Sequence, residues 1–282
     1  MPTRCPDIQR WVPDRWDQFI GNYRAKRLLR KLVKRIRQQV ALGNEEPLTK
    51  LCILLTGSSR SGKTALVKFF IRCILCEALD METLDPCRRQ CTACAQDSGL
   101  YGDAGIFRNL RSAEPGHEWE LGLHVVPLDC SRFTHPSELI TTLRDLNDGI
   151  TYGGLRIVHM DEVHRLVNRS MDDILLKTVE DTPNLWILST AKPGPLEDML
   201  LSRAIKLSTE PPTEANEMEC WLCDRCDEWG IRWEPEAIVR VVEKSNRVVG
   251  TALHALALAS LDPAEGLTVD LVEDDWVVEL RE

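Results

Sequence analysis

The octapeptide Gly57-Ser58-Ser59-Arg60-Ser61-Gly62-Lys63-Thr64 fits the phosphate-binding pattern G-x-x-x-x-G-K-[ST] at every fixed position. An apolar run at 51–55 precedes it as a buried strand would, and residues 64–71 follow with apolar side chains at helical spacing. The glycines let backbone N–H groups point at phosphate oxygens, and the positive end of the helix dipole faces the same anion. The sequence therefore predicts a strand, a phosphate-binding loop and a helix, in preference to a chance Gly- and Ser-rich turn.

The loop residues have distinct expected roles. We expect Lys63 to reach the outer phosphates of a nucleotide and the Thr64 hydroxyl to ligate Mg²⁺. The residues expected to contact the nucleotide in this segment are Gly57, Ser58, Ser59, Arg60, Ser61, Gly62, Lys63, Thr64 and Ala65.

Length and composition bound the class of protein. A chain of 282 residues can build a full core, as one large domain plus a smaller one. The formal charge of -9 excludes a global field that attracts nucleic acid, so any DNA contact must use a local basic patch. No signal peptide is recognisable at the N-terminus, and no apolar run approaches the ~18 residues of a membrane span. We therefore expect a cytoplasmic protein without a membrane partner.

Charge is unevenly distributed along the chain. Cations are dense between Arg24 and Arg37, whereas residues 270–282 are strongly acidic. A cationic helix of this kind is most often a solvated face, and contact with nucleic acid or phosphate is the alternative. Both interpretations stay open at this point.

Apolar runs at 51–55, 123–128, 155–160 and 185–189 alternate with helical patterns. This alternation predicts an α/β fold with a parallel sheet covered on both faces. The stretch 97–120, rich in Gly and charge, is expected to be an exposed insertion.

A domain boundary is expected at Pro211-Pro212, because only helical patterns follow it. The expected parts are a nucleotide-binding domain at 1–210, a small helical lid domain at 211–265 and an acidic tail at 266–282.

The third apolar run ends in the acidic pair Asp161-Glu162. Ligands of open α/β sheets collect at the carboxyl ends of the strands, so this pair is expected beside the phosphate-binding loop. Asp161 can hold Mg²⁺ through water, and Glu162 can orient and deprotonate the water that attacks a γ-phosphate. Lys63 and Glu162 are thus the first candidates for catalytic residues.

Four segments together carry a resemblance to a known family. They are Asp161-Glu162-Val163-His164-Arg165-Leu166, Leu175-Leu176-Lys177-Thr178-Val179-Glu180, Ser189-Thr190-Ala191-Lys192-Pro193 and the opening element Pro13-Asp14-Arg15-Trp16-Asp17-Gln18-Phe19-Ile20-Gly21-Asn22. They resemble the AAA+ ATPases of the clamp-loader branch, most of all the gamma/tau subunits of the bacterial DNA polymerase III clamp loader, over roughly residues 10 to 262. The resemblance implies a P-loop AAA+ domain with a five-stranded parallel sheet and a helical lid. It also implies ATP and Mg²⁺ as cofactors.

The resemblance assigns further site residues. Trp16 and Ile20 would wall the adenine pocket. Arg203, which follows two leucines and a serine, would be an arginine finger that reaches the γ-phosphate bound by a neighbouring subunit. Thr190, or else Ser189, would sense the γ-phosphate.

The same resemblance implies the partners. They are further AAA+ subunits in a homo- or hetero-oligomer, with a sliding clamp, polymerase subunits and primed DNA beyond them. The chain departs from the family at Leu253, which stands where the lid of the family carries an Arg that touches nucleotide. The sequence also ends about where the helical collar of the family would begin.

Cysteine spacing indicates a structural zinc site. Four of the eleven cysteines follow the pattern C-x10-C-x3-C-x2-C, which can close a tetrahedral thiolate cage: Cys76, Cys87, Cys91 and Cys94. The family has a zinc module at this place, here at about residues 73–96, and four unpaired thiols are the alternative. A second cluster is better explained by helix packing than by a metal: Cys220, Cys223 and Cys226.

In the resembling family, the loop after the second strand faces the DNA backbone. Here that loop spans 129–136, where Ser131 and Arg132 agree with the family, and Thr134 or Ser137 can donate to phosphate. A helix N-cap is the alternative interpretation of this segment.

These observations favour a clamp-loader-like AAA+ ATPase that hydrolyses ATP at subunit interfaces in DNA replication or repair. The alternative is an accessory subunit that binds ATP as an assembly switch and hydrolyses little of it. A P-loop kinase of small molecules is opposed by the Ser202-Arg203 motif and by the opening element at 13–22.

Overall fold

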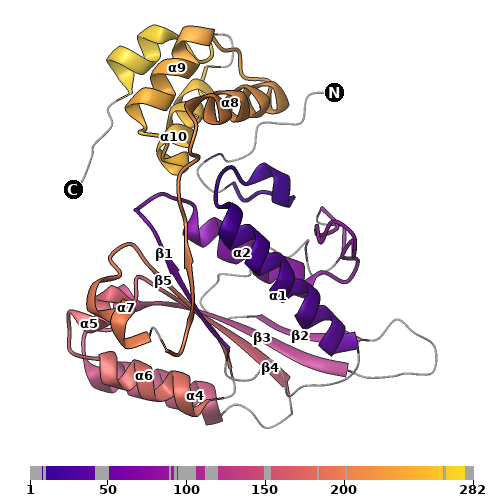
Figure 1. The fold of residues 1–282 in the computed structure, drawn as a ribbon, viewed down its shortest axis with the longest axis vertical. Coiled ribbons are helices and arrows are strands. Elements are labelled where there is room, and N and C mark those ends of the chain that lie inside the picture. The colour runs from indigo at the N-terminus through magenta and orange to yellow at the C-terminus, as the bar shows by residue number, and fades with distance from the viewer. Residues whose placement is uncertain are drawn as a thin grey trace.

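The computed structural model describes residue 8 and residues 11–41, 51–88, 90–91, 94, 106–111, 120–148, 154–182, 184–200, 202–262 and 265–276. Figure 1 shows a twisted sheet flanked by helices, with a separate group of helices at the top.

The sheet has the strand order β2-β3-β4-β5-β1-β6. Its strands are β1 (Cys52–Thr56), β2 (Ile106–Arg111), β3 (Glu120–Asp129), β4 (Gly154–Asp161), β5 (Leu185–Thr190) and β6 (Ile205–Ser208). All neighbouring pairs are parallel except β2 with β3. The five-stranded parallel sheet expected from the sequence is therefore confirmed.

The antiparallel edge strand β2 corrects the expectation of an exposed insertion at 97–120. Residues 106–111 pair with 120–125 along the edge of the sheet, so this part of the segment belongs to the sheet. A short edge strand needs only backbone pairing along one neighbour, which a composition rich in Gly and charge does not reveal. Residues 97–105 and 112–119 of that segment lie outside the described residues.

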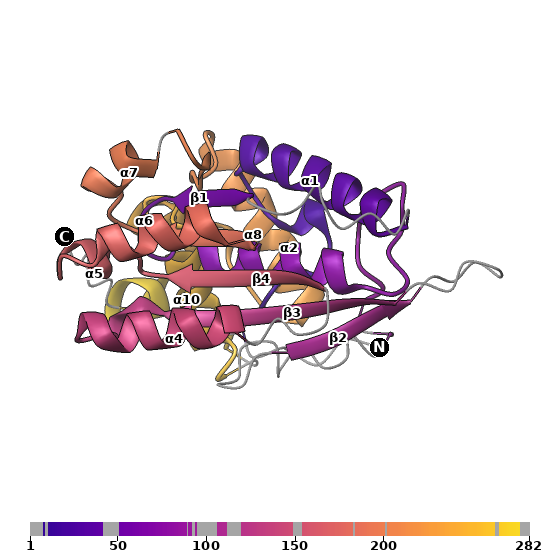
Figure 2. The same ribbon diagram turned by 90° about the horizontal axis from the view of Figure 1, so that it is seen from below.

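Two layers of helices cover the sheet, as Figure 2 shows from below. On one face lie α1 (Tyr23–Ala41) and α2 (Lys63–Leu75), and on the other lie α4 (Pro136–Asp148), α5 (His164–Val167), α6 (Asp172–Asp181) and α7 (Gly194–Leu200). Successive residues of a strand point to opposite faces. Accordingly, Ile53 and Leu55 pack towards α1 and α2, whereas Cys52 and Leu54 pack with α4 to α7.

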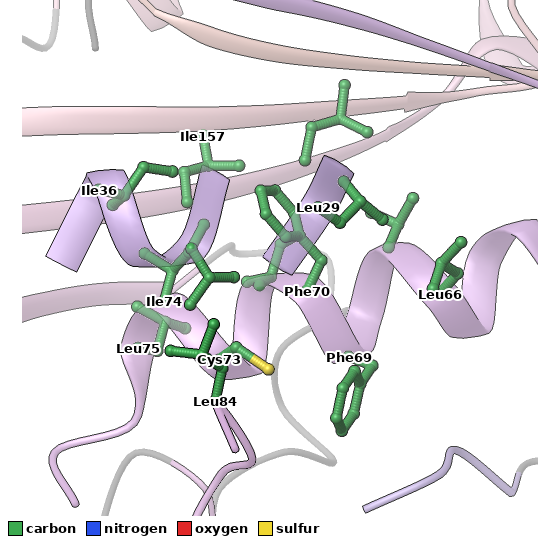
Figure 3. Packing of buried hydrophobic residues seen from close by; sticks show 14 of the residues in the cluster. Leu29, Ile36, Leu66, Phe69, Phe70, Cys73, Ile74, Leu75, Leu84 and Ile157 are labelled. Carbon is green, nitrogen blue, oxygen red and sulfur yellow. The ribbon is translucent and has the colours of Figure 1, made fainter. Parts of the chain in front are cut away.

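The core between the sheet and the first pair of helices is built from buried apolar side chains. Leu29 and Ile36 of α1 meet Phe70 and Ile74 of α2 below Ile157 of the sheet (Figure 3). Because both helices are fixed against the sheet, the start of α2 and the loop before it are held in place.

The helices after β6 have a hydrophobic core of their own. They are α8 (Ala215–Trp229), α9 (Pro235–Lys244) and α10 (Val249–Ala259). Ile8 and Ile20 from the N-terminal segment belong to this cluster, and so do Leu267, Val272 and Trp276, which fall within the segment assigned to the acidic tail. Short turns complete the fold at η2 (Trp16–Gln18), η5 (Cys130–Arg132) and the π-helical η6 (Leu271–Asp275). None of the helices described combines the length and the hydrophobicity needed to cross a membrane.

Candidate nucleotide-binding and catalytic site

The loop 57–62 connects β1, whose residues are all buried, to α2, which begins at Lys63. Gly57 has φ +151°, and a Cβ placed there would lie 2.0 Å from Thr209 Oγ1. Gly62 has φ +88°, and a Cβ placed there would have no heavy atom of the described residues within 4 Å, so only its backbone conformation calls for glycine. The first N–H groups of a helix lack intrahelical partners, so the loop delivers free donors to this point.

Lys63 folds back over the loop. Its Nζ donates to the carbonyl oxygens of Gly57 at 2.9 Å and Ser58 at 2.7 Å. Burial lowers the pKa of Lys63, and the carboxylates of Glu162 and Asp161 oppose that shift. The ammonium group is therefore bound to the phosphate-binding loop and is also attracted by the two acids.

Asp161 is the last residue of β4, and its carboxylate is fixed by three donors. Oδ2 accepts from Thr64 Oγ1 at 3.2 Å, while Oδ1 accepts from Ser189 Oγ at 2.5 Å and from the backbone N–H of Glu162 at 3.0 Å. A hydroxyl and a carboxylate are oxygen ligands of the kind that Mg²⁺ takes. The structure thus brings together Thr64 and Asp161, the two residues expected to hold magnesium.

Glu162 follows at the tip of the strand with φ +57°, a left-handed conformation that is uncommon for a residue with a side chain. Its Oε2 lies 3.5 Å from Nε2 of His164, and the other ring nitrogen, Nδ1, lies 3.1 Å from Thr190 Oγ1. The structure therefore links Glu162 to Thr190 through His164. Sequence reasoning assigned His164 no role, although its position two residues after Glu162 was the available signal.

Ser189 and Thr190 differ in their surroundings. The Ser189 hydroxyl contacts Asp161 and also lies 3.0 Å from Nε2 of the buried His159. Burial lowers the pKa of His159 to about 4, so its ring is neutral. Thr190 instead turns towards His164 and accepts a hydrogen bond from the backbone N–H of Lys192 at 3.0 Å.

A pocket of about 640 Å³ opens beside these groups. Its walls come from the N-terminal segment, the phosphate-binding loop, the tip of β4, and helices α8 and α10. The lining residues are Ile8, Trp11, Pro13, Gln18, Phe19, Ile20, Asn22, Ser59, Arg60, Ser61, Gly62, Lys63, Thr64, Ala65, Asp161, Glu162, Trp221, Val249, Gly250, Leu253 and His254.

Of the two residues expected at the adenine, Ile20 lines the pocket and Trp16 is absent from the described lining residues. The Trp16 ring packs edge-on against Phe69 with centroids 4.8 Å apart, and its indole nitrogen donates to the Leu84 carbonyl at 2.8 Å. Trp11 and Trp221 line the pocket instead. Their contribution depends on contacts between distant segments, which no local sequence pattern indicates.

Helix α10 touches the loop directly. The backbone N–H of Gly250 donates to the Arg60 carbonyl at 2.9 Å, and a Cβ at Gly250 would lie 2.7 Å from that oxygen. Leu253 and His254 line the pocket one turn further along. The helical unit is thereby in contact with the phosphate-binding loop.

Arg203 is not among the described residues that line the pocket of its own chain. Its side chain is 41% exposed, pairs with Glu180 through Nε, and donates from Nη1 to the Met199 carbonyl at 2.9 Å. This placement leaves Arg203 on the surface.

The four cysteines of the expected zinc module converge. The Sγ atoms of Cys76, Cys87, Cys91 and Cys94 all lie within 4.8 Å of one another. Zn–S bonds of about 2.3 Å in a tetrahedron require S–S separations of about 3.8 Å, so small adjustments would close such a cage.

Burial and hydrogen bonds within the cluster shift the pKa values of its thiols in opposite directions: the pKa of Cys76 falls, whereas those of Cys87 and Cys94 rise. Backbone N–H groups of Cys87 and Cys91 point at Cys76 Sγ (3.3 Å) and Cys87 Sγ (3.1 Å). A hydrogen bond from the Cys94 thiol lowers the pKa of Cys76 to about 5. The second group of cysteines consists of Cys220, Cys223 and Cys226. Among the described residues, it forms no cluster that could hold a metal ion.

The loop expected to face DNA is ordered by its own side chains. Asp129 accepts from the Ser131 backbone N–H at 2.9 Å, and Glu138 accepts from the backbone N–H groups of Thr134 and His135 at 2.8 Å and 3.2 Å. Glu138, and not Ser137, thus satisfies donors at the start of α4. The side chain of Arg132 is largely exposed, 4.0 Å from Asp129.

Comparison with solved structures shows what the fold resembles. The Holliday junction branch migration motor RuvB of Thermotoga maritima matches with a TM-score of 0.54 and 16% identity, over 95% of this chain and 71% of that one. A point variant of the same protein matches with a TM-score of 0.53 and 17% identity, over 93% and 71% of the two chains. No protein-family model and no curated protein matches the sequence. At this identity the likeness concerns the fold, and it confirms the α/β P-loop fold expected for the AAA+ class.

Proposed function

We propose that this protein is an AAA+ ATPase that binds ATP with Mg²⁺ and hydrolyses it at the interface between subunits. The observation that carries the proposal is the meeting of Lys63, Thr64, Asp161 and Glu162 at one pocket, from the start of α2 and the tip of β4. Phosphate-binding loops next to an acidic strand tip supply the parts needed for phosphoryl transfer to water.

Each residue has a role in this proposal. Thr64 and Asp161 hold Mg²⁺, which when bound neutralises charge on the β- and γ-phosphates. Lys63 places a positive charge beside the same oxygens once it leaves the loop carbonyls. Glu162 accepts a hydrogen bond from the attacking water and takes its proton.

The apolar half of the pocket suits the adenine base. Trp11, Ile20 and Trp221 contribute ring faces and aliphatic surface to the lining, and the Trp11 and Trp221 rings lie together with centroids 6.2 Å apart. Leu253 and His254 bring the lid against the same space.

Arg203 serves a second subunit in this proposal. It is exposed on the surface of its own chain, as expected for a group that completes a neighbouring site. This role implies an oligomer, homomeric or with other AAA+ subunits.

The biological setting we propose is DNA replication or repair in the cytoplasm. RuvB, which shares the fold, is described as a Holliday junction branch migration motor. The sequence motifs resemble clamp loaders, which favours a clamp-loader-like role with a sliding clamp, polymerase subunits and primed DNA as partners. Arg132, near the sheet edge that carries the site, and the exposed cations of α1 are the surfaces we propose for contact with DNA phosphates.

The test is the ATPase rate with and without primed DNA. Glu162→Gln removes the base and Arg203→Ala removes the finger, so each should lower kcat about a hundredfold or more. Matched controls are Glu243→Gln and Arg240→Ala, both exposed on α9, and they should retain the wild-type rate.

Mixing two inactive variants tests the interface. Lys63→Ala cannot bind nucleotide but still supplies Arg203, whereas Arg203→Ala has an intact loop. A mixture of the two should regain part of the activity if sites form between subunits. Equal, slow rates for the wild type and all variants would contradict the proposal.

The second candidate is an accessory subunit that uses ATP as an assembly switch with little hydrolysis. Leu253 favours it, because an apolar side chain at this lid position cannot contact phosphate charge. Tight ATP binding with oligomerisation in sedimentation experiments, and no turnover in any condition, would support this candidate over the first.

A further inference from the structure

His164 is the first residue of α5 and lies between the proposed base and the tip of the neighbouring strand. Its Nε2 is 3.5 Å from Glu162 Oε2, and its Nδ1 is 3.1 Å from Thr190 Oγ1. The His164 side chain is only 13% exposed, so its ring has little freedom to turn away. The contact to Glu162 is long for a hydrogen bond, as catalytic contacts often are before substrate binds.

The protonation state of His164 follows from its surroundings. Burial lowers its pKa, as do the cations Arg165 and Lys192, while the carboxylates of Glu162 and Asp161 oppose this. A neutral imidazole has one N–H donor and one acceptor nitrogen. Because the Glu162 carboxylate only accepts, Nε2 carries the hydrogen and Nδ1 accepts from the Thr190 hydroxyl.

The hydrogen bonds of the Thr190 hydroxyl follow from this tautomer. Its oxygen accepts from the Lys192 backbone N–H at 3.0 Å, and its single hydrogen has two acceptors within reach, His164 Nδ1 at 3.1 Å and the Lys192 carbonyl oxygen at 3.2 Å. With the hydrogen of His164 on Nε2, donation to Nδ1 is favoured, because the lone pairs of Nδ1 and of the hydroxyl oxygen would otherwise face each other. Thr190 thus orients the His164 ring, and the ring orients the Glu162 carboxylate. Catalytic triads also use a third group to orient the second.

We propose that His164 is a positioning residue, held by Thr190, that orients the carboxylate of Glu162 to take the proton of the attacking water. Thr190 then acts on the reaction through His164 and Glu162, and not by touching the γ-phosphate. The left-handed backbone of Glu162 needs such support, because conformations of this kind persist only where the surroundings determine them. This inference rests on the proposed ATPase function and assigns the linkage within its site.

Three substitutions of His164 separate the two contacts. In His164→Asn, the amide oxygen replaces Nδ1 and keeps the contact to Thr190. In His164→Gln, the longer amide replaces Nε2 and keeps the contact to Glu162. His164→Ala removes both. If both contacts are required, all three variants should lose at least about tenfold in kcat, because orienting groups of a base contribute at this scale.

Nucleotide affinity distinguishes positioning from direct binding. The three variants and Thr190→Val should bind ATP and ADP with dissociation constants within twofold of the wild type. If Thr190 touched the γ-phosphate, Thr190→Val would weaken ATP binding and leave ADP binding unchanged, and the inference would be overturned. Arg240→Ala, which removes an exposed side chain on α9 outside the site, is the control and should keep the wild-type kcat.

A double variant tests whether the residues form one chain. His164→Ala combined with Thr190→Val should be no more than twofold slower than the slower single variant, because both changes break the same link. If the losses in kcat of the two single variants multiplied in the double variant, the linkage of Thr190 to Glu162 through His164 would be contradicted. A wild-type kcat in His164→Asn or His164→Gln would contradict it as well.

A spectroscopic measurement keeps the inference separate from the proposed function. In ¹⁵N-histidine NMR of the whole chain, His164 should show the Nε2–H tautomer, and Thr190→Val should shift its Nδ1 resonance. This result is expected even if the wild type does not hydrolyse ATP. A doubly protonated His164 ring, or an Nδ1 resonance that stays unchanged in Thr190→Val, would overturn the inference. An inactive wild type would overturn only the ATPase proposal.

Discussion

At the scale of single residues, the site depends on backbone conformations that few amino acids adopt. Gly57, Arg60, Gly62 and Glu162 all have positive φ within or next to the pocket. Such conformations cost free energy, and they cluster where a protein needs donors and side chains in unusual directions. The phosphate-binding loop is therefore held by the packing around it.

Gly57 provides a prediction at this scale. Gly57→Ala should lower the free energy of unfolding by about 2–4 kcal/mol, because the new methyl group would lie 2.0 Å from Thr209 Oγ1 in a backbone conformation that alanine avoids. Gly194→Ala, at φ +40° with open space in the described structure around it, should cost only about 1–2 kcal/mol. Urea denaturation of both variants measures the difference, and equal losses would show that the contact with Thr209 relaxes without cost.

Residue-scale chemistry was also the part most accessible from the sequence. Lys63, Thr64, Asp161 and Glu162 stand in short motifs that predicted their meeting at one site, and the structure places them together. His164 lies in one of these motifs, yet its partner Thr190 is on another strand, and only the register of β4 with β5 brings the two together.

At the scale of elements, the parallel strands bring distant motifs to one edge. In the register of the sheet, Thr56 pairs with Thr190 and Asp129 with Asp161, so these strand ends lie side by side. Alternating apolar runs predicted this arrangement. The pattern of apolar runs did not reveal β2. This edge strand pairs with β3 alone, and such a strand does not need a continuous apolar run.

The cysteine module is an element that joins α2 to the segment after it. Cys76 follows the last residue of α2, and the other three sulfurs close around it. Leu84, which precedes them, accepts the hydrogen bond of Trp16. A metal at this place would therefore brace the end of α2 against the N-terminal segment.

We expect the purified chain to contain about one equivalent of zinc, held by four thiolates. Cys91→Ser should lower the zinc content and the melting temperature, since metal binding to such sites contributes folding free energy. Cys220→Ser, an exposed cysteine on α8, should change neither. Metal analysis by mass spectrometry with thermal unfolding decides the matter, and a metal-free wild type purified without chelator would refute the module.

At the scale of the whole molecule, the pocket lies where two cores meet. One core packs α1 and α2 on the sheet, and the other joins α8, α9 and α10 with Ile8 and Ile20 of the N-terminal segment. Trp11, whose ring centroid is 5.2 Å from that of Trp229, ties this segment to the helical unit. The placement of the helical unit over the loop results from this packing, which no local motif in the sequence specifies.

Nucleotide should therefore stabilise both parts together. At a hundred times its dissociation constant, Mg·ATP should add about 2.7 kcal/mol to the free energy of unfolding. The fluorescence of Trp221 should change, and amide exchange should slow in α10. Lys63→Ala should abolish these effects, whereas Lys177→Ala, an exposed lysine on α6, should not. Stabilisation confined to the sheet domain would show that the helical unit does not respond to ligand.

The hydrogen bond from Gly250 to Arg60 is made by main-chain atoms on both sides. Side-chain replacement cannot delete it, but any residue larger than glycine at that position would wedge α10 away from the loop. Attempts to change which ligands the pocket accepts should therefore keep Gly250 and vary Trp11 and Trp221 of the lining.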